Sequence, residues 1–373
     1  MDFNFFLPTR VISGAGCVRK GGAVFSALGR RCLIITGRHS AKLSGALDDC
    51  TAALTEQGVT YEVFDGIGPN PLLSSCEEAG RRAQAFGADF LIGIGGGSPL
   101  DATKAAAFFA TGLVHGTELY GKLPDCALPF VLIGTTAGTG SEVTPYSVLT
   151  VDETGRKKSF CDHTGHRTFA VCAFADPHYT EALPYGITIS TALDALCHAI
   201  EGYFSSKATD LSDLFAARAV SLLVDALRAV HKRPNNGDIP YAVRERLLYG
   251  SLYAGVTIST TGTGFCHPLG YFLSEEHQIP HGQACAVYLR AFLREAKAHC
   301  FEKYAHLFAS LGYGGSSVSA LIGELLDAPL PHLTDEQLRE VAHRCAPTAN
   351  FATSPGVFTE EKAYTLLKEV FPA

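Results

Sequence analysis

Short apolar runs alternate with amphipathic segments in the first half of the chain. The runs lie at residues 31–36, 61–64, 89–94 and 128–133, and the segments 44–57, 74–86 and 102–110 have helical spacing. Continuous apolar strands separated by helices are typical of a parallel sheet that is covered on both faces. We therefore expect a Rossmann-like α/β domain at the amino terminus, with ligand-binding loops at the carboxyl ends of its strands.

The second half has a different pattern. Long helical periodicities occur at 188–204, 211–231 and 243–253, and strand-like runs become scarce after residue 177. We interpret the chain as an α/β dinucleotide-binding domain at 1–176, followed by an all-α metal-binding and substrate domain at 177–373.

Composition excludes several classes of protein. Hydrophobic residues make up 47% of the 373 residues and charged residues 18%, which rules out a disordered chain. A formal charge of −7 leaves no general basic surface for nucleic acid. The start of the chain has no basic segment followed by an apolar one, and no apolar run reaches the roughly 20 residues of a membrane helix. We expect a cytoplasmic protein with reduced cysteines.

Two glycine-rich loops follow apolar runs and point to phosphate binding. Residues 95–101 read GGGSPLD, and free amides at the start of the helix that follows would attract a pyrophosphate. Residues 134–144 read GTTAGTGSEVT, with hydroxyls and amides suited to sugar or phosphate oxygens. Each could be an ordinary strand–helix turn. Two such loops at one sheet edge indicate an extended ligand such as a dinucleotide.

A third loop bears on the choice of cofactor. NAD sites usually carry an acid after the corresponding strand, whereas a nearby arginine accommodates the 2′-phosphate of NADP. Here Gly37, Arg38 and Ser40 follow the strand, and no acid occurs before Asp48. We favour NADP, with NAD as the other possibility; the alternative is that these residues are only solvated surface.

A possible metal site lies in the helical half. Asp194 and His198 are four residues apart, on one face of an otherwise apolar helix. His267 and His281 follow, each flanked by glycine and proline. Alone, the Asp–His pair could be a buried hydrogen bond. Together, three imidazoles and one carboxylate suit one divalent ion, Fe²⁺ or Zn²⁺, with a position left for substrate.

The segment CDHTGH at 161–166 also contains metal-binding residue types. It is a compact polar run without a partner cluster, and we interpret it as a surface turn.

These motifs together resemble the iron-containing (group III) alcohol dehydrogenase family. The resemblance runs nearly from end to end, through PTRVISGAG at 8–16, PNP at 69–71, the loops at 95–101 and 135–144, DALCHAIE at 194–201, HPLG at 267–270 and PHG at 280–282. It implies a dehydroquinate synthase-like scaffold. It also implies that Asp194, His198, His267 and His281 bind the metal. The residues implied to lie along the dinucleotide are Asn70, Gly96, Gly97, Ser98, Asp101, Thr135, Thr136, Thr139 and Lys158.

The chain departs from the family at one position. Many members have a histidine near the substrate four residues after the third metal ligand, and this chain has Tyr271 there. Tyr271, His277 or water would then relay the alcohol proton.

The resemblance implies reversible hydride transfer between NADP(H) and a small primary alcohol or its aldehyde. A polyol dehydrogenase of the glycerol type is the alternative, and a cyclising lyase like dehydroquinate synthase is more remote. The apolar residues Phe3, Phe5 and Phe6 are expected to form a first strand through which two copies pair as a homodimer.

Overall fold

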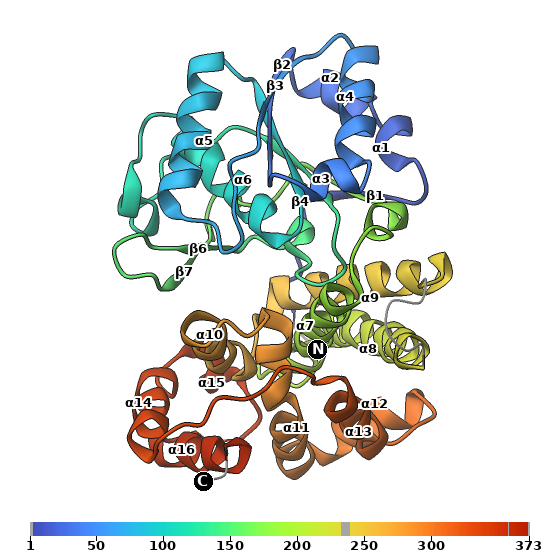
Figure 1. The fold of residues 1–373 in the computed structure, drawn as a ribbon, viewed down its shortest axis with the longest axis vertical. Helices are drawn as coiled ribbons and strands as arrows, with labels where there is room; N and C mark the ends of the chain where they lie inside the picture. Colours follow the sequence, from blue (N-terminus) through green and yellow to red (C-terminus); the bar gives the residue numbers. More distant parts are fainter. Residues whose placement is uncertain (1–2, 233–238, 357, 372–373) are drawn as a thin grey trace. The chain divides into compact units, whose positions relative to one another are not determined.

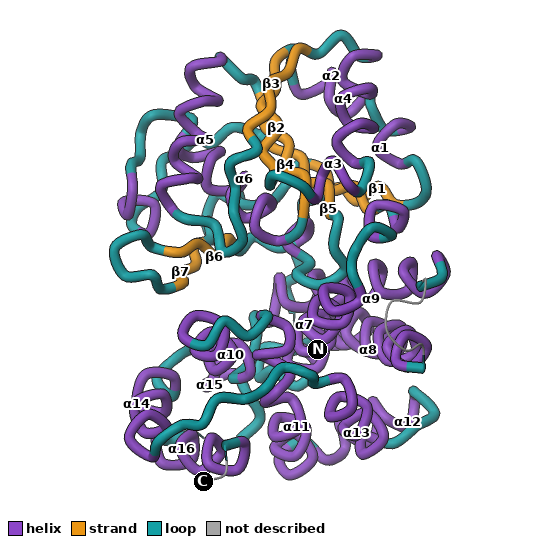
Figure 2. The backbone as a smooth tube through the Cα atoms, viewed as in Figure 1, coloured by secondary structure: helices purple, strands orange, loops and turns teal. Residues whose placement is uncertain are grey.

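The computed structural model describes residues 3–232, 239–356 and 358–371. They group into two compact units, which Figures 1 and 2 show in ribbon and tube form. One, the α/β unit, comprises residues 6–183 and 239–248, and the other, the helical unit, comprises residues 1–5, 184–238 and 249–373. The domain division placed between residues 176 and 177 stays a prediction.

A six-stranded parallel sheet is the centre of the α/β unit. Its order is β1-β8-β5-β4-β2-β3, and every neighbouring pair is parallel. The strands are β1 (Arg10–Ser13), β2 (Arg31–Thr36), β3 (Thr60–Phe64), β4 (Phe90–Gly95), β5 (Phe130–Gly134) and β8 (Cys172–Ala175). Strands β4 and β5 are buried along their whole length, as the continuous apolar runs predict. The parallel α/β architecture is confirmed.

Helices cover both faces of this sheet because successive strand residues point to opposite sides. Leu33 and Ile35 of β2 belong to one apolar cluster, with α5 (Leu73–Phe86) and α6 (Gly97–Phe109). Cys32 and Ile34 belong to the other, with α1 (Cys17–Lys20), α2 (Ala23–Leu28) and α4 (Ala46–Glu56). Figure 2 shows the two sets of helices on either side of the strands.

Short elements complete the α/β unit. A separate antiparallel ribbon pairs β6 (Ser147–Thr150) with β7 (Lys157–Phe160). Short helices are α3 (Ser40–Leu43), η1 (Gly116–Tyr120), η2 (Ser141–Val143) and η3 (Pro177–Thr180). The start of α9 groups with this unit, where the Arg244 guanidinium donates hydrogen bonds to the main-chain oxygens of Thr180 and Leu183.

The helical unit contains long helices where the periodicity predicts them. They are α7 (Tyr185–Tyr203), α8 (Asp210–His231) and α9 (Tyr241–Thr261), the last extending well past the predicted end at residue 253. The remaining helices are α10 (Cys266–Glu276), α11 (His281–His299), α12 (Phe301–Ser310), α13 (Gly315–Leu325), α14 (Asp335–Cys345), α15 (Ala349–Thr353) and α16 (Glu360–Val370).

The prediction of a strand at Phe3, Phe5 and Phe6 is wrong. These residues have no regular structure, and the first strand begins only at Arg10. Phe5 stacks on Phe215 of α8 with ring centroids 6.1 Å apart, and Phe6 lies 4.6 Å from the His166 ring. Phe5 and Phe6 therefore pack on rings of the same chain, whereas Phe3 is exposed, and the segment forms no strand.

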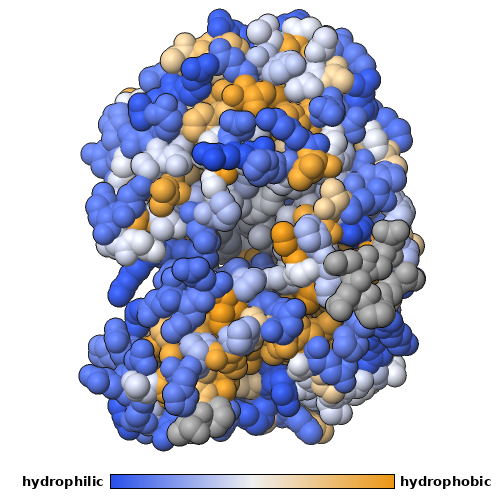
Figure 3. Space-filling model, in the orientation of Figure 1, coloured by the Kyte–Doolittle hydropathy of each residue, from blue (hydrophilic) through white to orange (hydrophobic). Residues whose placement is uncertain are grey.

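Figure 3 shows hydrophilic residues over most of the visible face, with smaller apolar areas between them. Among the described residues, no helix combines the length and the apolar character that crossing a membrane requires.

The packing of α5 on α6 depends on Gly80. A Cβ atom there would lie 2.4 Å from the Cβ of Phe109. We expect Gly80→Ala to lower the free energy of unfolding by about 1–3 kcal/mol, the usual cost of overpacking a core. Urea denaturation would measure the change. The control is Gly186→Ala in α7, where an added Cβ meets nothing within 4 Å; an equal loss in both variants would contradict this account.

Candidate metal centre and dinucleotide-binding loops

The two glycine-rich loops of the α/β unit lie against each other. The first follows β4, and α6 begins in it at Gly97. A Cβ at Gly96 would lie 3.0 Å from Cγ2 of Thr136, and one at Gly97 would lie 2.7 Å from Cγ2 of Thr139. Glycine is therefore required where the second loop approaches the first. The amides at the start of α6, including those near Ser98, provide the positive end of a helix for a phosphate group.

Asp101 is the side chain that connects these loops to the ribbon. Its Oδ1 accepts a hydrogen bond from Ser141 Oγ at 2.5 Å, and its Oδ2 accepts one from the Val148 amide at 2.9 Å. Both carboxylate oxygens are thus used within the protein. This arrangement makes Asp101 a residue that holds the loops in position.

Lys104 also connects the loops to the ribbon, a role that the sequence did not predict. Its ammonium group is fully buried and donates hydrogen bonds to Ser141 Oγ at 2.8 Å and to the Tyr146 carbonyl at 2.6 Å. Burial lowers the pKa of Lys104, while the nearby Asp101 carboxylate opposes this shift. A lysine within the largely apolar stretch at 102–110 was the signal that could have identified it.

Three further residues proposed to lie along the dinucleotide have distinct environments. Thr135 is buried, and its Oγ1 has no hydrogen-bond partner within the described parts of the chain. Asn70 adopts a left-handed conformation with φ 52°, and its carbonyl accepts a hydrogen bond from Thr150 of β6. Lys158 of β7 is exposed, with its Nζ 4.4 Å from the centre of the Tyr120 ring.

The loop after β2 is more open. Arg38 is exposed, while Gly37 and Ser40 are half-buried, and no acid lies between β2 and the end of α3. A Cβ at Gly37 would lie 3.2 Å from the carbonyl oxygen of Ile67, so the loop is close to the segment after β3. Lys42 forms an exposed ion pair with Asp65 at 3.4 Å.

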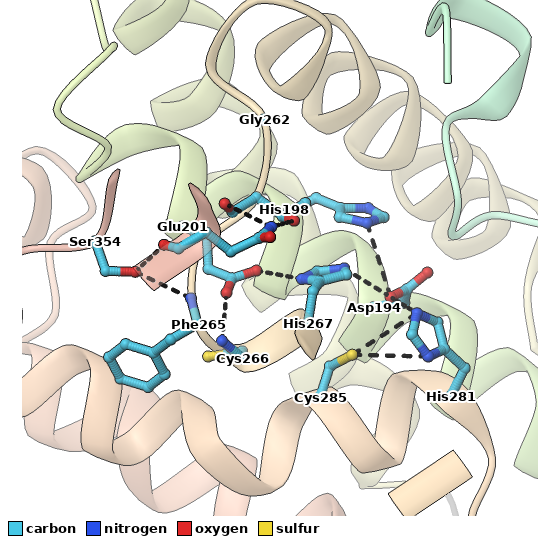
Figure 4. Close-up of polar contacts among 12 residues, drawn as sticks. Asp194, His198, Glu201, Gly262, Phe265, Cys266, His267, His281, Cys285 and Ser354 are labelled. Atoms are coloured by element: carbon cyan, nitrogen blue, oxygen red, sulfur yellow. Dashed lines mark hydrogen bonds and ion pairs between the residues drawn. The ribbon is translucent and has the colours of Figure 1, made fainter. Parts of the chain in front are cut away.

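In the helical unit, three of the four predicted metal-binding side chains, the histidines, are directed at Oδ1 of the fourth, Asp194. Asp194 and His198 come from α7, His267 from the first turn of α10, and His281 is the first residue of α11. The Oδ1 of Asp194 lies 3.8 Å from Nε2 of His198, and 3.6 Å from Nε2 of both His267 and His281. Figure 4 shows the imidazoles directed at this carboxylate from three elements.

These distances suit ligands of a common ion. They exceed hydrogen-bonding distance, and Asp194 Oδ1 and His267 Nε2 are buried polar atoms without a hydrogen-bond partner among the described residues. Two ligands of a tetrahedral ion with bonds of roughly 2.0–2.1 Å are about 3.4 Å apart. Such buried atoms are costly to leave unpaired, and a divalent cation would satisfy both.

Glycines allow α7, α10 and α11 to pack closely enough to bring these four side chains together. A Cβ at Gly282 would lie 1.7 Å from the carbonyl oxygen of Ser190, so the first turn of α11 contacts α7 through its backbone. A Cβ at Gly270 would lie 2.6 Å from the sulphur of Cys285, and α10 therefore packs closely on α11. The flanking glycines thus position the ligands through helix packing.

Glu201 is a second residue that sequence reasoning left without a role. Its Oε2 lies 2.5 Å from His267 Nδ1, and its Oε1 accepts a hydrogen bond from the Cys266 amide at 2.8 Å. Donation from Nδ1 to Glu201 turns Nε2 towards Asp194, and Nε2 can bind a metal ion once its own proton is lost. Residues 194, 198 and 201 recur at helical spacing, which was the signal available in the sequence.

The charges at this site are strongly coupled. Burial lowers the pKa of His267, but the carboxylates of Glu201 and Asp194 outweigh it and raise that pKa to about 10. Burial raises the pKa of Asp194, and the imidazoles of His198 and His281 outweigh it and hold that pKa below its usual value. The protein without metal therefore offers a carboxylate at this position.

Of the two residues considered for the proton relay, Tyr271 contacts a predicted metal ligand, His281. Its ring is stacked on that of His281, with centroids 5.4 Å apart and an interplanar angle of 14°. The His277 ring instead packs edge-on against Phe272 at 5.2 Å.

The segment at 161–166 is a turn, as predicted. Asp162 accepts hydrogen bonds from the Gly165 amide at 2.9 Å and from Arg167 Nε at 2.6 Å. Among the described residues, its histidines join no group of metal donors.

Comparisons with known proteins cover nearly the whole chain. Residues 8–177 match the iron-containing alcohol dehydrogenase family, and residues 188–371 match the C-terminal part of the Fe-containing alcohol dehydrogenase family.

Individual relatives differ in the cofactor that they are named for. The chain is 28% identical over 332 residues to the NADPH-dependent butanol dehydrogenase of Clostridium saccharobutylicum, covering 87% of this chain and 82% of that one. It is 32% identical over 325 residues to the NAD-dependent methanol dehydrogenase of Bacillus methanolicus, covering 85% and 82%.

The fold agrees with this relationship. The crystal structure of an iron-containing alcohol dehydrogenase from Thermotoga maritima superposes with a TM-score of 0.89 at 34% identity, covering 100% of both chains. Since both halves match in sequence and the whole chain matches in structure, the protein belongs to the iron-containing alcohol dehydrogenase family and is an NAD(P)-dependent oxidoreductase that acts on CH–OH groups.

Proposed function

We propose that this protein interconverts small primary alcohols and their aldehydes with NADP(H), using one divalent metal ion held by Asp194, His198, His267 and His281. The convergence of three imidazole Nε2 atoms on the buried Asp194 Oδ1, at 3.6–3.8 Å, carries this proposal. Relatives named for butanol and methanol support the substrate class. The ligand set suits Fe²⁺ and Zn²⁺ alike.

The bound metal would act as a Lewis acid on the substrate oxygen, and the dinucleotide would donate or accept the hydride. The chain's own residues prepare the site. Glu201 binds Nδ1 of His267 and so keeps its Nε2 directed at the other ligands. The His281 side chain is 30% exposed, against 5% for Asp194, so a substrate oxygen can approach from the His281 side. Tyr271, whose ring is stacked on that of His281, is the residue that we propose for the proton relay.

The cofactor preference rests on the loop after β2. Gly37 leaves space, and Arg38 and Ser40 offer donors to a 2′-phosphate, with no carboxylate in the loop to repel it. The amides at the start of α6, with Thr135, Thr136 and Thr139, would contact the remainder of the dinucleotide. The twelve free cysteines fit a reducing compartment, and we propose the cytoplasm. A homodimer remains our expectation for the assembly.

Metal binding is tested by replacing the central ligand. We expect Asp194→Ala to weaken Zn²⁺ or Fe²⁺ binding by more than roughly 100-fold, beyond the 10–100-fold typical of outer-shell partners, and to abolish turnover. Metal content after dialysis and isothermal titration would measure the change. His231→Ala, an exposed position on α8, is the control and should bind metal like the unmodified protein.

The role of Glu201 predicts a smaller effect. Glu201→Gln keeps the size of the side chain but removes the charge that holds His267, and we expect metal affinity to fall about 10- to 100-fold. Titration with Zn²⁺ would check it. An unchanged affinity would show that Glu201 has only a packing role.

Cofactor preference is tested at the loop after β2. Gly37→Asp would repel a 2′-phosphate and accept hydrogen bonds from a 2′-hydroxyl, so we expect kcat/KM to shift towards NADH by about 1.5–3 kcal/mol, roughly 10- to 150-fold. Steady-state kinetics with butanal and each nucleotide would measure this. Arg38→Ala should raise KM for NADPH and leave that for NADH nearly unchanged. Equal or better efficiency of the unmodified enzyme with NADH would refute the preference.

The proton relay is tested by pH–rate profiles. Because Tyr271 stacks on His281 and His277 packs on Phe272, we expect Tyr271→Phe to change the profile of kcat and His277→Asn to leave it unaltered. Unaltered profiles in both variants would assign the proton transfer to water.

A further inference from the structure

The helix α10, which carries His267, begins without a capping side chain of its own. Its N-cap residue is Phe265, whose side chain makes no capping hydrogen bond. Phe265 and Cys266 are both fully buried, and the Phe265 ring stacks on that of Phe351 with centroids 5.5 Å apart. The first amides of a helix have no partner within it, and water does not reach these two. Each therefore needs an acceptor from another part of the chain.

Two distant side chains supply those acceptors. The Phe265 amide donates a hydrogen bond to Ser354 Oγ at 3.0 Å. The Cys266 amide donates one to Oε1 of Glu201, and the other oxygen of Glu201 binds His267. Figure 4 shows both side chains directed at this first turn of α10. His267 is the second residue of α10, so the turn that Ser354 and Glu201 hold is also the turn that delivers the ligand.

The Ser354 hydroxyl is itself fixed by α15. It donates a hydrogen bond to the Asn350 carbonyl at 2.7 Å, and Ser354 is only 5% exposed. The Asn350 side-chain amide donates to Oγ1 and to the carbonyl oxygen of Thr263, at 2.8 and 3.1 Å. Thr263 lies in the loop between α9 and α10. The α15 segment thus binds this loop at two points, one at Thr263 and one at the amide that opens α10.

We propose that Ser354 is a positioning residue, which sets where His267 stands in the metal centre. The inference rests on the proposed metal centre and deepens it by one supporting residue. Glu201 fixes the rotation of the His267 ring through Nδ1, whereas Ser354 fixes the backbone from which the ring projects. Metal–ligand bonds tolerate deviations of only about 0.2 Å. Because Nε2 of His267 lies 3.6 Å from Asp194 Oδ1, a small movement of this turn would take it out of range of an ion that the other ligands hold.

The alternative is that Ser354 is an ordinary helix cap that contributes stability alone. Ser212 offers the comparison, because it is also a buried serine whose hydroxyl binds an amide at a helix start. Its Oγ accepts a hydrogen bond from the Thr209 amide at 2.8 Å and donates one to the Thr209 carbonyl at 2.9 Å, where α8 begins. None of the four proposed ligands lies on α8. If Ser354 contributes stability alone, Ser354→Ala and Ser212→Ala should behave alike.

Metal binding separates the two roles. Metal-free full-length protein would be titrated with Zn²⁺ to obtain the affinity and with Co²⁺ to record the visible absorption, which depends on the geometry of the ligands. Urea denaturation would confirm that each variant is folded. We expect Ser354→Ala to bind one ion with about 10-fold lower affinity, the lower end of the range for outer-shell partners, and to change the Co²⁺ spectrum. Ser212→Ala, the matched control, should lose stability but keep the affinity and the spectrum.

Asn350→Ala is a second variant, which removes the attachment at Thr263. Asn350 is half-buried, so its replacement disturbs folding less than that of Ser354. We expect its Zn²⁺ affinity to fall in the same direction. If Ser354→Ala does not fold, a lowered affinity in Asn350→Ala would support the proposal and an unchanged one would overturn it.

The remaining outcomes separate this inference from the proposed function. An unchanged Zn²⁺ affinity in folded Ser354→Ala, or an equal loss in Ser212→Ala, would overturn the role of Ser354 and leave the four-residue metal centre intact. Failure of the unmodified protein to bind either ion, with Asp194→Ala behaving identically, would overturn the metal centre and this inference with it.

Discussion

The burial of Asp194 among three imidazoles is the constraint from which the arrangement of the helical unit follows. A carboxylate that is 3% exposed, with an Oδ1 that has no hydrogen-bond partner in the described parts of the chain, is unfavourable unless a cation compensates. To form this cluster, α7, α10 and α11 must approach within backbone contact, and Gly282 and Gly270 make that possible. The same closeness brings Glu201 to His267 and Cys285 to His281, so these contacts are consequences of one packing solution.

The two units would recognise the proposed ligands by opposite means. In the α/β unit the backbone would be the recognising group, because glycines at the carboxyl ends of the strands expose amides and a helix start supplies positive potential for phosphate. In the helical unit the side chains of the proposed metal centre would bind the ion, and helix packing and the hydrogen bond of Glu201 to His267 position them. Glycine contributes to both sites. It permits the close approach of two loops in the α/β unit and of two helices in the helical unit.

Buried charges act as supports for both sites. Lys104 and Asp101 hold the two glycine-rich loops and the β6–β7 ribbon together through Ser141, Tyr146 and Val148. Glu201 holds His267 and the amide that precedes it in the chain. Buried ionic groups of this kind contribute little net stability, because desolvation offsets their attraction. Their value here is that they fix the positions of loops and ligands that would otherwise have several conformations.

Local pattern was sufficient for most of the secondary structure and for the i, i+4 pair Asp194–His198, because strand and helix periods are set by covalent geometry and show directly in the order of apolar residues. Residue type and the flanking glycines and prolines made His267 and His281 candidates, and the resemblance to a known family implied the same ligand set. Tertiary structure alone decided that Phe5 and Phe6 pack on neighbouring rings and that their segment forms no strand. It also decided that Asp101 and Lys104 bridge two loops and that Cys285 lies near the proposed metal ligands. These outcomes depend on distances between elements far apart in the chain, which are set by how apolar faces and glycines pack, and no local period records them.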